Sequence, residues 1–131
     1  MILGVASPWT ERKGLGDFVR LAGELDEHYV IVLVGLSKRQ IKRLPKRIVA
    51  IERTGSKKEL AKIYTIADVF FNPTREDNYP TVNLEAEACG TPVVTYDTGG
   101  CRETIKNAES ATTVGVDDAR RHFEHAKSLR G

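Results

Sequence analysis

The stretch FFNPTREDNYPTVNLEAEACGTPVVTYDTGGCRE, from Phe70 to Glu103, decides the fold class. It begins with an apolar run of strand length and continues into an acidic loop. A helix is expected to open at Pro80, and a second apolar run, at residues 92–96, leads into a turn that contains two glycines. Strand, loop, helix and strand in this order are typical of a unit of a parallel sheet.

The rest of the chain repeats this alternation. Runs rich in β-branched residues, such as YVIVLV at residues 29–34, alternate with stretches whose apolar residues recur at helical spacing. The expected strands lie near residues 1–6, 29–34, 47–53, 68–72, 92–96 and 110–114. The expected helices lie near residues 15–25, 38–44, 57–67, 80–89 and 117–129, with Ser37, Ser56 and Asp117 as caps of three of them.

Short connections between these elements predict the fold. We expect an α/β domain with a Rossmann-like parallel sheet of about six strands and helices on both faces. No linker, repeat or low-complexity tract divides the sequence, so residues 1–131 are interpreted as a single domain. In such sheets, ligands bind beyond the carboxyl ends of the strands.

The helix after Pro80 carries a carboxylate that packing alone does not explain. At about 100° per residue, Glu85 falls near the middle of the apolar arc of residues 82–89, whereas Asn83 and Glu87 lie on the opposite side. An ionised carboxylate that is buried without partners is costly, so Glu85 needs donors. Either the protein core or a ligand with adjacent hydroxyls supplies them.

The start of this helix is a candidate anion site. Tyr79 is a poor N-cap, so the amides of residues 81–83 lack a local acceptor unless Asp77 or Asn78 folds back to cap them. Free amides and the positive end of a helix dipole favour phosphate. A phosphate there and a diol on Glu85 would together describe a nucleotide; the alternative is a capped helix with a hydrogen-bonded Glu.

Two other loops carry candidate chemistry. Lys13, beside Arg12, precedes a helix and is suited to a diphosphate, although a surface Lys beside a turn is the alternative. The loop at Glu76 and Asp77 is suited to holding sugar hydroxyls or to acid–base chemistry, and the alternative is a solvated acidic loop. A third feature, the six cations of residues 38–47, is either a solvated helix face or a contact for an anionic membrane or a phosphorylated acceptor.

Composition excludes several classes. The net charge of +2 does not argue for a nucleic-acid partner, and the apolar runs are far shorter than a membrane span. The two cysteines and three histidines have no zinc-ligand spacing, so no metal site is expected. A reduced, cytoplasmic compartment is the default interpretation.

The block NPTREDNYPTVNLEAEACGTPVVTYDTGG resembles the donor-binding signature of the family 4 glycosyltransferases, which are retaining nucleotide-sugar enzymes of the GT-B fold. Residues 84–94 match the run Glu-Ala-x-Ala-x-Gly-x-Pro-Val-Val and the residue before it. Gly99, Gly100 and Glu103 match the turn that follows. The loop that ends at Lys13 and Gly14 looks like the family's Lys-Gly loop.

The resemblance implies a role for each matching position. Glu85 falls on the acid that binds the nucleotide ribose, and Asp77 falls on the acid that contacts the donor sugar, with Glu76 one position away. Lys13 falls on the diphosphate-binding Lys. The backbone that would meet the sugar and phosphates is that of Asn78, Tyr79, Pro80, Thr81 and Val82.

The match also has departures. Pro8 occupies the place of an Arg that commonly precedes the family's Lys, so either Arg12 substitutes for it or the diphosphate is held differently. The base is expected near the loop after the third strand, at Arg53, Thr54 and Gly55. No metal or other cofactor is implied beyond the nucleotide-sugar, for which a UDP-sugar is the first choice.

The family's enzymes have two α/β domains, and this chain corresponds to the C-terminal, donor-binding one. We therefore expect the acceptor domain to be absent, the chain alone to be inactive, and the sequence to be a cut-out domain or a gene fragment. The intact enzyme would transfer a hexosyl group to a cell-surface polysaccharide or glycolipid, in the cytoplasm with a peripheral membrane contact. The alternatives are a non-catalytic nucleotide-binding or interaction module and half of a sugar-nucleotide epimerase.

Overall fold

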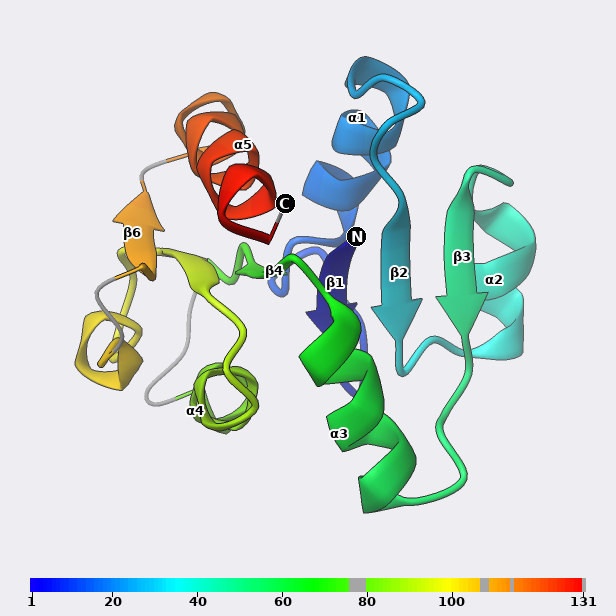
Figure 1. Ribbon diagram of the computed structural model, residues 1–131. Coiled ribbons are helices and arrows are strands. Elements are labelled where there is room, and N and C mark those ends of the chain that lie inside the picture. Colours follow the sequence, from blue (N-terminus) through cyan, green and yellow to red (C-terminus); the bar gives the residue numbers. More distant parts are fainter. Residues whose placement is uncertain (76–79, 107–108, 114, 131) are drawn as a thin grey trace.

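Six parallel strands form one sheet in the computed structural model, which describes residues 1–75, 80–106, 109–113 and 115–130. The strand order across the sheet is β3-β2-β1-β4-β5-β6 (Figure 1). This order, with its reversal between β1 and β4, is that of a doubly wound sheet. The strands are β1 (Ile2–Val5), β2 (Ile31–Val34), β3 (Ile48–Ile51), β4 (Val69–Asn72), β5 (Val93–Tyr96) and β6 (Ala111–Thr113).

Helices cover both faces of this sheet, which confirms the predicted fold class. One face is covered by α1 (Leu15–Glu24), α2 (Lys38–Arg43) and α5 (Val116–Arg130). The opposite face is covered by α3 (Lys57–Ile66) and α4 (Thr81–Ala88), as Figure 1 shows. A short 3-10 helix, η1 (Arg102–Thr104), follows β5. None of the helices in the described ranges is both long enough and apolar enough to cross a bilayer.

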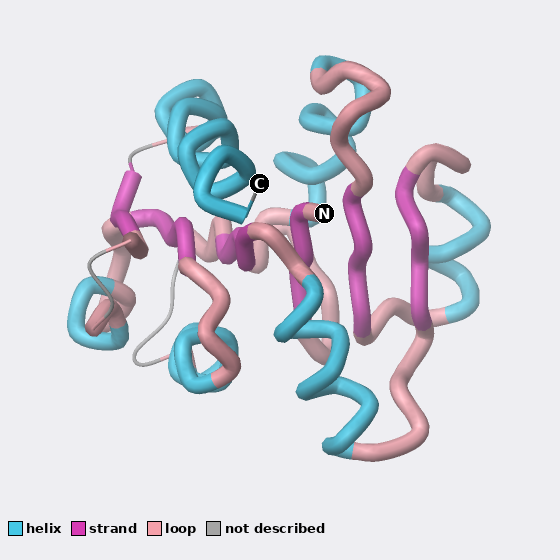
Figure 2. The backbone as a smooth tube through the Cα atoms, in the orientation of Figure 1, coloured by secondary structure: helices cyan, strands magenta, loops and turns pink. Residues whose placement is uncertain are grey.

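Alternation along each strand divides the core into two layers. Ile2 and Phe71 belong to the cluster beneath α1 and α5, whereas their neighbours Leu3 and Phe70 belong to the cluster beneath α3 and α4. All four side chains are at most 1% exposed. Successive residues of a strand point to opposite faces, so a strand covered on both sides is apolar throughout. The central strands in Figure 2 therefore read as unbroken apolar runs in the sequence.

Side-chain caps fix the starts of two helices, as the sequence predicts. The Ser37 hydroxyl accepts from the amide of Gln40, whose side chain in turn accepts from the Ser37 amide. The Ser56 hydroxyl accepts from the amide of Glu59. The prediction for Asp117 is wrong: α5 begins at Val116, so Asp117 lies inside the first turn, where its carboxylate accepts from Arg20.

The sheet opens at the point where its strand order reverses. Among the described residues, the ladder between β1 and β4 joins two residue pairs, Ile2 with Val69 and Leu3 with Phe70. On the other side of β1, all four residues pair with β2. The carboxyl ends of β1 and β4 are thus free to separate, and this separation positions the candidate site.

Candidate functional site

A hollow of about 230 Å³ lies at the carboxyl ends of β1 and β4. Its lining comes mainly from the β1–α1 loop and from the start of α4. The structure therefore brings Lys13 to the same place as the predicted Pro80, Thr81 and Val82. The remaining lining residues are Val5, Ala6, Ser7 and Asn72.

Contacts with the β4 exit fix the loop that carries Lys13. Gly14 has a φ of 90°, and a Cβ added there would meet the Pro73 ring and carbonyl at 2.4 to 2.8 Å. The amide of Arg75 donates to the carbonyl of Arg12 over 2.8 Å. The Lys-Gly pair thus has a geometric basis, because only a residue without a Cβ lets the loop lie this close to β4.

Arg12 does not reach the same hollow in this structure. It is exposed and is absent from the residues that line the cavity, while its carbonyl is occupied by Arg75. Of the two basic residues proposed for the diphosphate, the geometry therefore brings only Lys13 to the start of α4.

The start of α4 has no side-chain cap from its N-cap residue. That residue is Pro80, which cannot accept a hydrogen bond through its ring, and its carbonyl accepts from the amide of Asn83 over 3.1 Å. The helix begins at Thr81, one residue later than predicted, and Thr81 and Val82 line the hollow. Helix N-termini of this kind favour anions because amides and dipole both present positive charge.

The polar face of α4 was predicted wrongly. Asn83 is fully buried and bridges Asn72 and Thr104 through hydrogen bonds of 3.0 Å each, whereas Glu85 is exposed. The apolar arc alone could not locate this face, because α4 packs on a buried polar pair rather than on apolar residues only. Glu85 needs no buried donors, although it does accept from the Tyr64 hydroxyl over 3.1 Å.

Glu85 lies on the same helix as two residues that line the hollow, Thr81 and Val82. Thr81 and Glu85 are four residues apart and therefore share one face of α4. Glu85 does not itself line the hollow, but Thr81, one turn before it, does. Burial raises the pKa of Tyr64 well above its ordinary value, and the charge of Glu85 raises it further, so the phenol remains a hydrogen-bond donor.

A second hollow, of about 350 Å³, lies at the end of β3. The predicted Arg53 and Thr54 line it, together with apolar surface from Ile51 and Ile63 and charged groups from Glu59 and Lys62. Gly55 is not among its lining residues; its amide donates to the Glu59 carboxylate. Ile63 precedes Tyr64 in α3, so the helix that lines the second hollow also carries the partner of Glu85.

Four predicted residues, Glu76, Asp77, Asn78 and Tyr79, lie outside the described residues. Sequence reasoning did not single out Ser7 or Asn72 as lining residues. Asn72 had a usable signal, since a polar residue directly follows three apolar ones at the carboxyl end of a predicted strand.

A third hollow, of about 440 Å³, lies between Asp17, Arg75 and Tyr96, and the sequence did not predict it. Among the described residues, no cluster of three or more His, Cys, Asp or Glu could hold a metal ion.

The sequence profile of the family described as "Glycosyl transferases group 1" matches residues 1–129. The chain belongs to this family. The fold is that of the C-terminal domain of a GT-B glycosyltransferase, as the resemblance of residues 70–103 to the family's signature predicted. The Lys13 loop, the start of α4 and the Gly-Gly turn are thus features of a glycosyltransferase domain.

Curated relatives of this glycosyltransferase domain match its sequence over about half of the chain. The D-inositol 3-phosphate glycosyltransferase of Thermobispora bispora is 34% identical over 73 residues, which are 56% of this chain and 17% of that protein. An N,N'-diacetylbacillosaminyl-diphospho-undecaprenol alpha-1,3-N-acetylgalactosaminyltransferase of Campylobacter jejuni is 34% identical over 59 residues, or 45% and 16%. The matched part thus spans about one sixth of these relatives.

Solved structures share the fold over nearly the whole chain. The sucrose-phosphate synthase of Thermosynechococcus elongatus has a TM-score of 0.79 and 22% identity, over 97% of this chain and 36% of that one. Anabaena Alr3699/HepE, in complex with UDP-glucose, has a TM-score of 0.73 and 18% identity, over 98% and 38%. At these identities the likeness concerns the fold, and the chain spans less than two fifths of either protein.

Proposed function

We propose that the chain is the donor-binding domain of a retaining glycosyltransferase and that its site holds a nucleotide-sugar. The observation that carries this proposal is the hollow at the carboxyl ends of β1 and β4, which is lined both by Lys13 and by the start of α4. A cation and a helix N-terminus that come from separate segments and line one cavity are suited to a diphosphate.

In the proposed complex, the diphosphate lies between Lys13 and the amides at the start of α4. During transfer the bond between the sugar and the diphosphate breaks, and negative charge grows on the leaving nucleotide. In this proposal, Lys13 and the dipole of α4 stabilise that charge, so they favour the transition state over the bound donor. The proposal assigns no metal ion or other cofactor to this step.

The nucleoside part is assigned to residues beyond the first hollow, on α4 and on α3. Thr81 lines the first hollow, Glu85 lies one turn further along the same face of α4, and Tyr64 binds Glu85 from α3. The ribose diol is assigned to the exposed Glu85 carboxylate. The base is assigned to the second hollow, whose apolar surface at Ile51 and Ile63 is suited to a planar ring, with Arg53 and Thr54 beside it.

The donor sugar is assigned to the segment between β4 and α4, with Asp77 and Glu76 as the candidate acids. A UDP-sugar is the proposed donor; this agrees with the UDP-glucose complex of the HepE structure, although that likeness is one of fold. The transferred group is proposed to be a hexosyl unit. The acceptor is proposed to be a polysaccharide or glycolipid; the Campylobacter relative, whose named acceptor is undecaprenol-linked, supports a lipid carrier.

Transfer itself is proposed to need a second domain that binds the acceptor, since the matched relatives are several times longer than the matched segment. On this reading the chain alone binds the donor but does not transfer it. The intact enzyme is proposed to act in the cytoplasm, at the inner face of the membrane.

Calorimetry of the 131-residue chain with UDP, GDP and ADP tests the donor proposal. We expect one of the three to bind, and Glu85→Ala and Lys13→Ala each to weaken binding by about tenfold, since each removes a charged contact with the ligand. Glu27→Ala and Lys106→Ala are matched controls, because both residues are exposed and neither lines either hollow. Absence of binding for all three nucleotides at millimolar concentration would overturn the proposal.

A further inference from the structure

Positive charge in this chain is concentrated at one end of the sheet. Residues 38–62 contain ten of the 20 Lys and Arg but two of the 18 Asp and Glu, a formal charge of +8. The rest of the chain has a formal charge of −6, so the net charge of +2 conceals a strong asymmetry. These residues form α2 and β3, at the β3 edge of the sheet, and the first half of α3, on the opposite face (Figure 1).

The cations of α2 point away from the protein. Ile41 and Leu44 pack against the core cluster beneath α1 and α5, which fixes the orientation of the helix. Lys38, Arg39, Lys42 and Arg43 fall within an arc of about 140° on the other side of the helix. All four, and Lys46 in the following turn, are exposed. These five residues are called the basic face below.

The basic face forms no ion pair in the described part of the chain. None of its five side chains forms an ion pair with a described acid. Arg47, which follows it, differs: its guanidinium donates to three carbonyls at the end of α1, so it is structural. With residues 1–75, 80–106, 109–113 and 115–130, the cations of the basic face make no comparable hydrogen bond.

Their arrangement works against the helix that carries them. Lys38 and Lys42, like Arg39 and Arg43, are four residues apart, where like charges repel. Lys38 and Arg39 also lie in the first turn, which contains no acid and where the helix dipole disfavours positive charge; only Lys42 and Arg43, in the last turn, are favoured by the dipole. An ordinary solvated helix gains from mixed charges, so this pattern favours a surface that meets an anionic partner.

We propose that the basic face docks the protein on an anionic lipid bilayer. A bilayer presents many negative headgroups over a broad surface, which matches cations that spread over the outside of a helix and line no described cavity. Single-stranded nucleic acids are bound largely by aromatic stacking, and residues 38–62 contain no Phe, Trp or Tyr. The face also carries no exposed large apolar residue for insertion, so docking is electrostatic.

The basic face and the hollow at β1 and β4 have no described residue in common. A hydrogen bond nevertheless joins α2 to the β1–α1 loop, which lines the hollow. Gln40 of α2 donates its side-chain amide to the carbonyl of Trp9 over 2.8 Å, and Trp9 belongs to the loop that ends at Lys13. This proposal does not depend on donor binding, because it concerns different residues.

Co-sedimentation of the full chain with vesicles tests it. We expect binding to vesicles of phosphatidylcholine and phosphatidylglycerol in about a 2:1 ratio, weak binding to phosphatidylcholine alone, and loss of binding as salt shortens the range of the interaction. The triple variant Arg39→Gln, Lys42→Gln, Arg43→Gln should lower the partition coefficient about 100-fold, since each cation near such a surface is worth about fivefold.

A matched triple variant separates the basic face from net charge. Lys57→Gln, Lys58→Gln, Lys62→Gln removes the same charge from α3, on the opposite side of the sheet, and should lower partitioning by less than about threefold. Arg39→Lys with Arg43→Lys should retain binding. Equal losses in the two triple variants, or equal binding to neutral vesicles, would overturn the proposal. So would tighter binding to a DNA duplex than to the anionic vesicles, which would assign the face to nucleic acid.

Discussion

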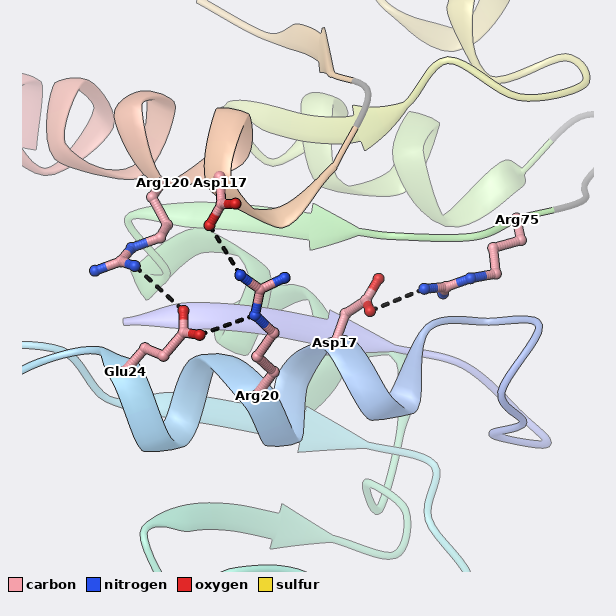
Figure 3. Close-up of polar contacts among 6 residues, drawn as sticks. All are labelled: Asp17, Arg20, Glu24, Arg75, Asp117 and Arg120. Atoms are coloured by element: carbon pink, nitrogen blue, oxygen red, sulfur yellow. Dashed lines mark hydrogen bonds and ion pairs between the residues drawn. The ribbon is translucent and has the colours of Figure 1, made fainter.

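Arg75 and Asp17 form an ion pair across 58 positions of sequence, with Nη2 of Arg75 2.9 Å from Oδ1 of Asp17 (Figure 3). The Tyr96 hydroxyl donates to the other carboxylate oxygen over 2.6 Å. Asp17 therefore joins α1, the exit of β4 and the end of β5. Since the Arg75 amide also donates to the carbonyl of Arg12, this junction helps to hold the Lys13 loop against the exit of β4.

Asp17→Asn should destabilise the protein by about 1 kcal/mol, because the charged contact to Arg75 is lost while Tyr96 keeps an acceptor. Asp17→Ala should cost about 2 kcal/mol, since Tyr96 then loses its partner as well. Urea unfolding measures both. Glu24→Gln, in the exposed pairs with Arg20 and Arg120 (Figure 3), is the control and should shift the midpoint less than either. Equal shifts in the three variants would contradict a special role for Asp17.

Asn83→Ala should destabilise the protein by about 2 to 3 kcal/mol, because it leaves the buried Asn72 amide and the Thr104 hydroxyl each with one partner fewer. A double-mutant cycle with Asn72→Ala, followed by urea unfolding, measures the coupling. Strict additivity of the two substitutions would show that the pair is not a unit.

Gly14→Ala should both destabilise the protein and weaken nucleotide binding, because the new Cβ would collide with Pro73 and displace the Lys13 loop. Gly90→Ala is the matched control. Gly90 also has a positive φ, of 82°, but a Cβ there meets no atom within 4 Å. It should therefore cost about 1 kcal/mol of stability and leave nucleotide affinity unchanged. Thermal unfolding and calorimetry on the same samples distinguish the two; equal affinities would contradict the role of the loop.

Tyr64 and Tyr96 should resist ionisation in the folded protein. Burial raises the pKa of both phenols, and acceptance of their hydrogens by Glu85 and Asp17 raises the pKa further. Because the folded-state pKa lies above the unfolded value of about 10, the stability from these groups is fully present below pH 10 and is lost at higher pH. Ultraviolet titration should show ionisation of both only with unfolding. Tyr96→Phe should flatten the fall in stability above pH 10.

The order of elements could be predicted from the sequence because the evidence for it is local. Runs such as residues 31–34 show a strand that is covered on both faces, and Ser37 and Ser56 mark helix starts through their own hydroxyls. Parallel strands place their exits at one edge of the sheet, so the location of Lys13 and Pro80 at that edge could also be expected.

The errors arose where distant residues decide the outcome. The face of α4 depends on Asn72 and Thr104, which are 11 and 21 positions from Asn83, so no periodicity within the helix could reveal it. Asp117 resembles a helix cap in sequence, but its carboxylate accepts a hydrogen bond from Arg20 of α1, which lies 97 positions earlier in the chain. The hollow beside Asp17 depends on the same kind of contact.

The uneven division of charge, +8 in residues 38–62 against −6 elsewhere, also governs how copies of the protein meet one another. Each molecule is a large electric dipole, so the basic end of one copy attracts the acidic remainder of the next. Such attraction is screened over about 10 Å at 0.1 M salt and reaches much further in dilute buffer. The protein should therefore be more soluble in moderate salt than in none, and it should adhere to both cation and anion exchangers.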